Sequence, residues 1–151
     1  MDNEREEKQK PELVFADLHK GRRFSPIAYP ITLGLVENFM DTVGDRHPLY
    51  SGDSGIHKDP IVPLAPPGLA AIYARLSYLQ DYTMPSGGIL IKQEFKFTGP
   101  IRIVDTLDVT AKVIERFTDD KERNWVTFFI EARNQKVEPI STIRLTVIWP
   151  K

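Results

Sequence analysis

The sequence predicts an α+β fold in which a curved antiparallel sheet wraps around one apolar helix. The first observation is a change of period. Apolar residues recur at helical spacing over residues 32–44 and 67–80, whereas from Gly88 onward they alternate every second residue. The second observation is the composition of residues 67–80, where small apolar side chains surround most of the helix. A helix of this kind needs cover on more than one side, which a curling sheet can provide.

Both helices have recognisable ends. Thr32 is a suitable N-cap for the first helix, and Gly44 is a suitable stop. Pro67 and Gly68 open the second helix, which is expected to run to about Gln80. The apolar stripe of the second helix consists of Leu69, Ile72, Tyr73, Leu76 and Leu79.

Four strands are expected in the second half of the chain, in antiparallel meander order. They cover residues 89–97, 107–113, 125–132 and 143–149. Residues 15–23 are predicted as a short strand with a turn at Gly21, after which Pro26 and Pro30 interrupt regular structure. We expect residues 1–10, which are almost entirely polar, to form a flexible tail, and residues 11–151 to form a single domain.

Composition excludes several classes of function. The 20 basic and 21 acidic residues give a net charge of −1, which removes the usual electrostatic argument for binding nucleic acid or an anionic membrane surface. No apolar run approaches the roughly 18 residues of a membrane span, and the first ten residues do not resemble a secretory signal. The absence of cysteine excludes disulfides and thiolate nucleophiles, and it suits a cytoplasmic location.

Three segments resemble the MaoC-like branch of the hot-dog fold. They are GDRHPLY at residues 44–50, APPGLAA at residues 65–71, and FKFTGPIRIVDTLDVTAKV at residues 95–113. The resemblance extends from about Phe15 to Trp149. It implies an (R)-specific enoyl-CoA hydratase or a 3-hydroxyacyl-thioester dehydratase of fatty acid metabolism. It also implies a curved antiparallel sheet wrapped around a central helix.

The resemblance assigns the catalytic residues to the segment after the first helix. Asp45 occupies the position of the family's aspartate, and Tyr50 stands where the family has a catalytic histidine. A phenol is a poor base at neutral pH but can donate a hydrogen bond. His47 is therefore the other candidate for the second polar contact, whereas His57 and His19 are interpreted as surface residues.

The start of the second helix is the other half of the expected site. Pro66 and Pro67 have no N–H, so the backbone groups of Gly68 and Leu69 are the first donors at this helix start. Glycine lets a ligand atom approach closely. The resemblance implies that the Gly68 N–H polarises a thioester carbonyl, but a plain start of a buried helix would have the same residues.

Other conspicuous residues are interpreted as structural. Aromatic side chains at strand spacing are expected to pack in the core, namely Phe95, Phe97, Phe128, Phe129 and Trp149. Asp105 and Thr106 resemble the family's Gly-Asp-Thr turn, with Val104 in place of the glycine. No set of His, Asp and Glu has the spacing of a metal site, so we expect neither a metal nor another cofactor.

Three functions remain open at this point. The first is reversible hydration of a 2-enoyl thioester of coenzyme A or acyl carrier protein. The second is a non-catalytic, substrate-holding subunit that pairs with a MaoC-like partner carrying the intact Asp–His motif. The third is a hot-dog thioesterase. Because chains of this fold usually join their sheets edge to edge, the resemblance implies a homodimer or a heterodimer.

Overall fold

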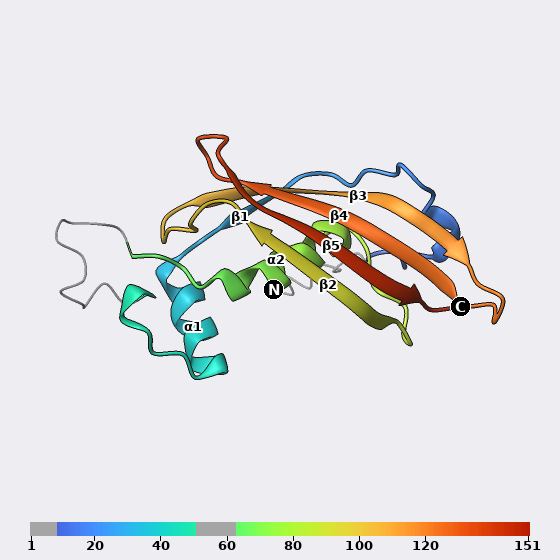
Figure 1. Cartoon of the computed structure of the whole chain (residues 1–151), viewed down its shortest axis with the longest axis horizontal. Coiled ribbons are helices and arrows are strands. Elements are labelled where there is room, and N and C mark those ends of the chain that lie inside the picture. The colour runs from blue at the N-terminus through green and yellow to red at the C-terminus, as the bar shows by residue number, and fades with distance from the viewer. Residues whose placement is uncertain (1–8, 51–62) are drawn as a thin grey trace, which may run out of the picture.

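The computed structural model describes residues 9–50 and 63–151. A curved antiparallel sheet covers helix α2, and helix α1 lies beside the start of α2 (Figure 1). The helices are η1 (Phe15–Asp17), α1 (Leu33–Val43), η2 (Pro48–Tyr50), η3 (Pro67–Leu69) and α2 (Ala70–Leu79). The strands are β1 (Ile27–Pro30), β2 (Ile89–Phe97), β3 (Thr106–Thr118), β4 (Asn124–Arg133) and β5 (Pro139–Trp149). This arrangement confirms the predicted α+β, hot-dog fold class.

The order of strands in the sheet is β1-β3-β4-β5-β2. The prediction of a simple meander was therefore wrong for one strand. Only β3, β4 and β5 follow one another as neighbours, and β2 crosses to the far side to pair with β5. The eight residues between β2 and β3 are long enough for this crossing, so the chain does not close a tight hairpin there.

The segment before α1 was predicted incorrectly in two respects. Residues 15–23 do not form a strand, because Phe15–Asp17 form a 3-10 turn. The predicted turn at Gly21 is confirmed, since Gly21 takes a left-handed φ of 90°. The strand lies further along, at Ile27–Pro30, where Tyr29 pairs with Leu107 of β3. Proline is tolerated in β1 because β1 is an edge strand.

The predicted ends of α1 are confirmed. The Thr32 Oγ1 accepts a hydrogen bond from the Leu35 N–H at 3.1 Å, and Gly44 adopts a left-handed φ of 72°. At the second helix, Pro67 and Gly68 begin a 3-10 turn that continues directly into α2. Local capping chemistry therefore sets both ends of α1, whereas α2 begins at a Pro-Gly turn without a side-chain cap.

Aromatic side chains join α2 to the sheet. The Tyr78 ring stacks on the Phe128 ring of β4 with 4.2 Å between centroids, and Trp149 of β5 packs at the edge of both rings. The Trp149 Nε1–H donates to the Leu13 carbonyl at 2.8 Å, which ties the N-terminal segment to the same core. Phe128 and Trp149 are thus core residues, as predicted.

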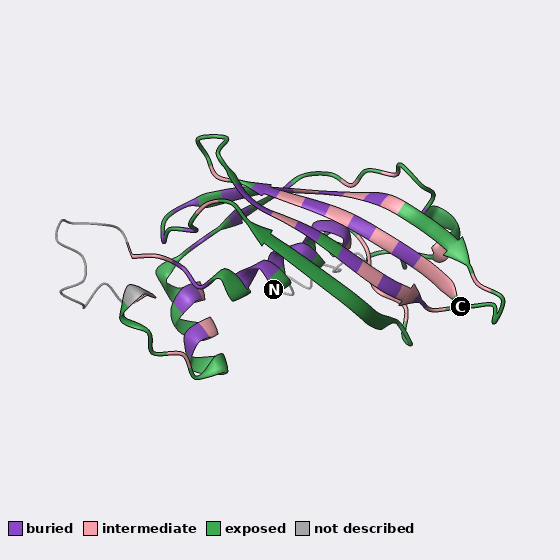
Figure 2. Ribbon diagram, in the orientation of Figure 1, coloured by how far each residue is buried: buried purple, intermediate pink, exposed green. Residues whose placement is uncertain are grey.

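Other apolar residues lie at the surface instead. Phe95 and Phe97 of β2 were expected in the core, yet they are 36% and 45% exposed. Ile72 and Leu76 of the predicted apolar stripe are also exposed, because α2 buries the face that carries Tyr73. Figure 2 shows the contrast: β2 is exposed along its whole length, whereas β5 beside it alternates between buried and accessible positions.

Candidate functional site

The segment after α1 positions the carboxylate of Asp45. Gly44 reverses the chain at the end of α1, and the Asp45 N–H donates back to the Met40 carbonyl at 3.0 Å. The Asp45 Oδ1 accepts a hydrogen bond from the His47 N–H at 2.9 Å. Its Oδ2 accepts no hydrogen bond from the described residues. The carboxylate is half-buried, so one oxygen shapes the turn and the other can bind water or a ligand.

His47 and Tyr50 lie beside this carboxylate. The Tyr50 N–H donates to the His47 carbonyl at 3.1 Å, and the two rings are 5.7 Å apart between centroids. The Tyr50 ring is half-buried against the hydrophobic core, whereas His47 is exposed. The structure therefore brings Asp45, His47 and Tyr50 together. His57, the other histidine considered in this segment, lies outside the described residues.

Tyr50 is held in its neutral form. Burial raises the pKa of the phenol above its ordinary value, and the nearby Asp45 carboxylate raises this pKa further. A phenol in this environment keeps its proton throughout the physiological range. It can donate a hydrogen bond to water, substrate or a carboxylate, but it is not a base.

The start of the second helix offers one backbone donor. The Leu69 N–H donates to the Pro66 carbonyl at 3.2 Å, and the Leu69 side chain is fully buried. Leu69 is therefore not the free donor that the sequence suggested. The Gly68 N–H has no acceptor among the described residues, and it lies at the positive end of the helix. Gly68 is thus the group that can meet partial negative charge.

Phe39 connects the two halves of the candidate site. A Cβ atom built on Gly68 would lie 2.8 Å from the Cζ of Phe39, so the ring of this α1 residue rests directly against the glycine. The contact places α1 beside the start of α2, as Figure 1 also shows. No described hydrogen bond joins Asp45 to Gly68, and the four cavities below contain neither residue.

One of these cavities is a groove of about 170 Å³ between α2 and β2. Its lining combines small residues of α2 with apolar residues of two strands, among them Ala71, Ala74, Leu90, Phe95 and Leu145. Sequence reasoning missed this groove because it assigned Phe95 to the core. The sequence signal for the groove was the pair Ala71 and Ala74, since such small side chains leave space between a helix and a sheet.

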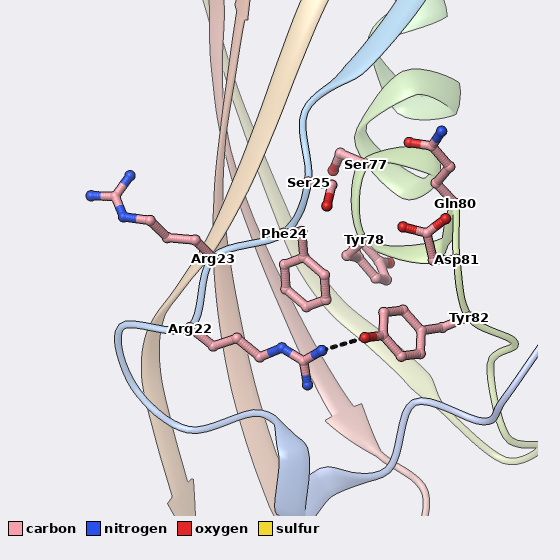
Figure 3. Close-up of a pocket in the computed structure, with 9 residues that line it drawn as sticks. All are labelled: Arg22, Arg23, Phe24, Ser25, Ser77, Tyr78, Gln80, Asp81 and Tyr82. Atoms are coloured by element: carbon pink, nitrogen blue, oxygen red, sulfur yellow. Dashed lines mark hydrogen bonds between the residues drawn. The ribbon is translucent and has the colours of Figure 1, made fainter.

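A smaller cavity of about 80 Å³ lies at the other end of α2 (Figure 3). Arg22 is one of its lining residues, and its guanidinium lies over the rings of Phe24 and Tyr82 at 4.9 and 5.2 Å. The same group donates to the Tyr82 hydroxyl at 2.7 Å and to the Asp17 carbonyl at 2.8 Å. Because the guanidinium is occupied by protein contacts, it fastens the N-terminal segment to the segment that follows α2.

Two further cavities are lined largely by strand residues and turns. The larger, about 390 Å³, lies where Asp105 accepts hydrogen bonds from the Arg102 N–H and from the Gln135 side chain. Asp105 is nearly fully buried, which agrees with its expected structural role. The other cavity, about 230 Å³, lies between Pro26 and Phe129. Within residues 9–50 and 63–151, no group of three or more His or acidic residues could hold a metal ion. None of the described helices is long and apolar enough to cross a membrane.

The family model of the FAS1-like dehydratase domain region matches residues 18–142. The chain therefore belongs to this family of dehydratase domains. This membership confirms the MaoC-like resemblance at the level of family and fold. A comparison with curated proteins finds no significant match.

Solved structures share the fold at low identity. The monoamine oxidase regulatory protein of Archaeoglobus fulgidus is 23% identical, with a TM-score of 0.77 over 94% of this chain and 97% of that one. The (R)-hydratase of A. caviae, which is involved in PHA biosynthesis, is 17% identical, with a TM-score of 0.69 over 88% and 98%. The HadBC complex, a (3R)-hydroxyacyl-ACP dehydratase of Mycobacterium tuberculosis, is 17% identical, with a TM-score of 0.68 over 85% and 95%.

Proposed function

We propose that this chain catalyses the reversible hydration of a 2-enoyl thioester to a 3-hydroxyacyl thioester. Membership of the dehydratase family supports the class of reaction. The observation that carries the proposal is the position of Asp45, a half-buried carboxylate just past the end of α1, the helix whose Phe39 rests against Gly68. A base and an oxyanion donor are the two groups that this reaction needs.

In the hydration direction, Asp45 accepts a proton from water while the water oxygen bonds to C3 of the enoyl group. The electrons of the double bond move toward the thioester carbonyl, and the Gly68 N–H donates to the carbonyl oxygen as negative charge develops there. The proton held by Asp45 then passes to C2. Tyr50 keeps its own proton and orients water or substrate by donating a hydrogen bond.

The groove between α2 and β2 is suited to the acyl chain. It begins one helical turn after Gly68, at Ala71, and its lining is largely apolar. The carrier is coenzyme A or acyl carrier protein, and the reaction uses no cofactor beyond this thioester. A cytoplasmic location remains a prediction from the sequence.

A second function is favoured by Tyr50. The family position of the catalytic histidine is filled by a phenol whose pKa burial and Asp45 both raise, so imidazole chemistry is not available there. A chain of this kind can hold the acyl thioester while a second hot-dog subunit with an intact Asp–His pair supplies the base. The dehydratase HadBC, whose structure shares this fold, is itself a complex, which supports this second function.

The decisive assay measures loss of the enoyl chromophore of crotonyl-CoA by the purified chain. We expect turnover that Asp45→Asn reduces at least about a hundredfold, because the general base is lost. Asp41→Asn is the matched control, since Asp41 is an exposed carboxylate in the last turn of α1, close to Asp45 in the sequence, and it pairs with Arg46. Tyr50→His is expected to raise kcat by about 10²-fold by restoring an imidazole.

Each other result has a definite meaning. No turnover by the chain alone, together with activity on mixing with a MaoC-like protein that has the intact motif, would replace the first function by the second. Release of free thiol from a saturated acyl-CoA would replace both by thioester hydrolysis. Equal rates for the wild type and for Asp45→Asn would remove Asp45 from the mechanism.

A further inference from the structure

The groove between α2 and β2 contains a positive charge that the proposed chemistry does not use. Arg75 of α2 lines this groove together with apolar residues of the helix and the sheet. Its guanidinium forms no hydrogen bond or ion pair with another described residue. The described residues that line the groove include no aspartate or glutamate, so no acidic side chain there neutralises Arg75. A cation in this position favours a ligand group with negative charge.

Two neutral donors line the same groove. Tyr78 follows Arg75 on α2, and Gln93 comes from β2. Tyr78 is only 5% exposed, and its hydroxyl makes no hydrogen bond with a described residue. Burial raises the pKa of Tyr78 to about 12, and the nearby positive charge of Arg75 opposes this rise without cancelling it. The phenol therefore keeps its proton and is available as a donor.

The rest of the groove is lined largely by apolar side chains. Ala71 and Ala74 come from α2, and Leu145 and Val147 come from β5. These side chains suit the methylene groups of an acyl chain, but they offer no partner to a charged end. A ligand that uses the whole groove is therefore an apolar chain that ends in an anionic group. In an acyl thioester, that group is a carboxylate.

The position of Arg75 along α2 favours a short chain. Arg75 lies seven residues after Gly68, and seven residues of helix rise by about 10 Å. Helical side chains lean toward the N-terminus of their helix, so a long side chain covers the turn before its own Cα. Ala71, one turn before Arg75, lines the groove beside it. The charge of Arg75 therefore lies less than two full turns beyond Gly68.

We propose that the acyl group of the substrate ends in a carboxylate, which the Arg75 guanidinium binds in the groove between α2 and β2. Tyr78 and Gln93 donate to the same carboxylate. The substrate is then a 2-enoyl thioester of a short dicarboxylic acid. This inference rests on the proposed function for the orientation of the chain, because that function places the thioester carbonyl at the Gly68 N–H.

Isothermal titration calorimetry with saturated thioesters tests the proposal without requiring turnover. Glutaryl-CoA carries the distal carboxylate, and hexanoyl-CoA is a neutral chain of similar length. We expect the wild type to bind glutaryl-CoA at least about tenfold more tightly, because the carboxylate gains a charged partner. Arg75→Gln should reduce this preference to about twofold or less, and Arg75→Glu should reverse it, since like charges repel each other.

Arg144→Gln is the matched control. Arg144 is an exposed arginine of β5 whose guanidinium lies over the Phe129 ring, and it does not line the groove. This change should alter the preference by less than about twofold, because an exposed charge outside the groove is screened by solvent and salt. Both probes contain the same coenzyme A, so contacts with the carrier cancel in the ratio. Circular dichroism checks that the variants fold.

The outcomes separate this inference from the proposed function. Equal or tighter binding of hexanoyl-CoA by the wild type, no binding of either thioester, or a preference that survives Arg75→Gln would each overturn the inference. The expected preference without any hydration of crotonyl-CoA or glutaconyl-CoA would overturn the proposed function and support the carboxylate site. If both are correct, kcat/KM for hydration of glutaconyl-CoA exceeds that for 2-hexenoyl-CoA by at least about tenfold.

Discussion

The contact between Phe39 and Gly68 supports the most direct structural prediction. Replacing Gly68 by alanine places a Cβ 2.8 Å from the Cζ and 3.4 Å from a Cε of Phe39. Carbon atoms pack best at about 3.5–4.0 Å, so the ring tip has to move by roughly 0.7 Å or more. The ring is half-buried and is the far end of a side chain, which allows this movement at moderate cost.

The expected loss of stability follows from two opposing terms. Overpacking costs about 1–3 kcal/mol, and replacing glycine by alanine in a helix returns up to about 1 kcal/mol. We therefore expect Gly68→Ala to lower the free energy of unfolding by about 1 kcal/mol. In the background of Phe39→Leu, which removes the ring tip, the same change should cost close to nothing.

Urea denaturation of the four proteins in this double-mutant cycle measures the coupling. An interaction energy of at least about 0.5 kcal/mol between the two positions is expected for residues in contact. Additivity of the two single changes would show that the Phe39 ring does not rest on Gly68. The same four proteins can be assayed for hydration, since the added methyl group also obstructs the approach of a thioester oxygen to the Gly68 N–H.

Three further predictions concern strain, pH and a buried hydrogen bond. Val104 is 74% exposed and has a φ of 79°, so Val104→Gly should stabilise the chain by about 0.5–1 kcal/mol in urea denaturation; a loss of stability would contradict this strain. Desolvation raises the pKa of the Asp119 carboxyl, but hydrogen bonds from the Trp125 indole and from Arg123 outweigh it and hold this pKa well below its usual range. The stability that Asp119 contributes is present above about pH 4 and is lost as the pH falls through the lowered pKa. Melting temperatures measured between pH 7 and 2 should thus fall more steeply for the wild type than for Asp119→Asn, and parallel curves would be inconsistent with this assignment. Trp149→Phe removes the donor to the buried Leu13 carbonyl and should cost about 1–3 kcal/mol by urea denaturation, whereas a neutral change would show that the carbonyl finds another donor.

The helices were predictable because their ends are encoded locally. The Thr32 cap and the left-handed Gly44 act within a few residues of the helix they bound, so spacing and residue type sufficed. The hairpins that join β3, β4 and β5 have the same local character. The position of β2 in the sheet is not encoded locally, because β2 pairs with β5, which follows much later in the chain.

Pairing at the sheet edge also explains why β1 was missed. A four-residue strand that ends in Pro30 has no convincing pattern of its own, and it exists because β3 provides a partner. Phe95 and Phe97 of β2 were wrongly predicted in the core because their local pattern was convincing. Their alternating pattern is that of a buried strand, but in the single chain nothing described covers them.

The candidate site also contains features that neighbouring residues encode and features that depend on contacts between distant parts of the chain. Asp45, His47 and Tyr50 could be grouped from the sequence, because they lie within six residues of one turn. The Phe39 ring against Gly68 could not be predicted, since it depends on how α1 leans on α2. The use of the Leu69 N–H by Pro66 was likewise hidden, because sequence does not distinguish a 3-10 start from an α-helical one.

The crossing of β2 to the far side of the sheet has a consequence for biosynthesis. Phe95 and its partner Ile143 are 48 residues apart, so β2 leaves the ribosome well before the strand that receives it has been made. During that interval a stretch rich in isoleucine and phenylalanine waits in an open state that is prone to aggregation. Pairing between strands so far apart in the sequence slows folding, and it lengthens the time for which the apolar side chains of β2 are open to aggregation or to a chaperone.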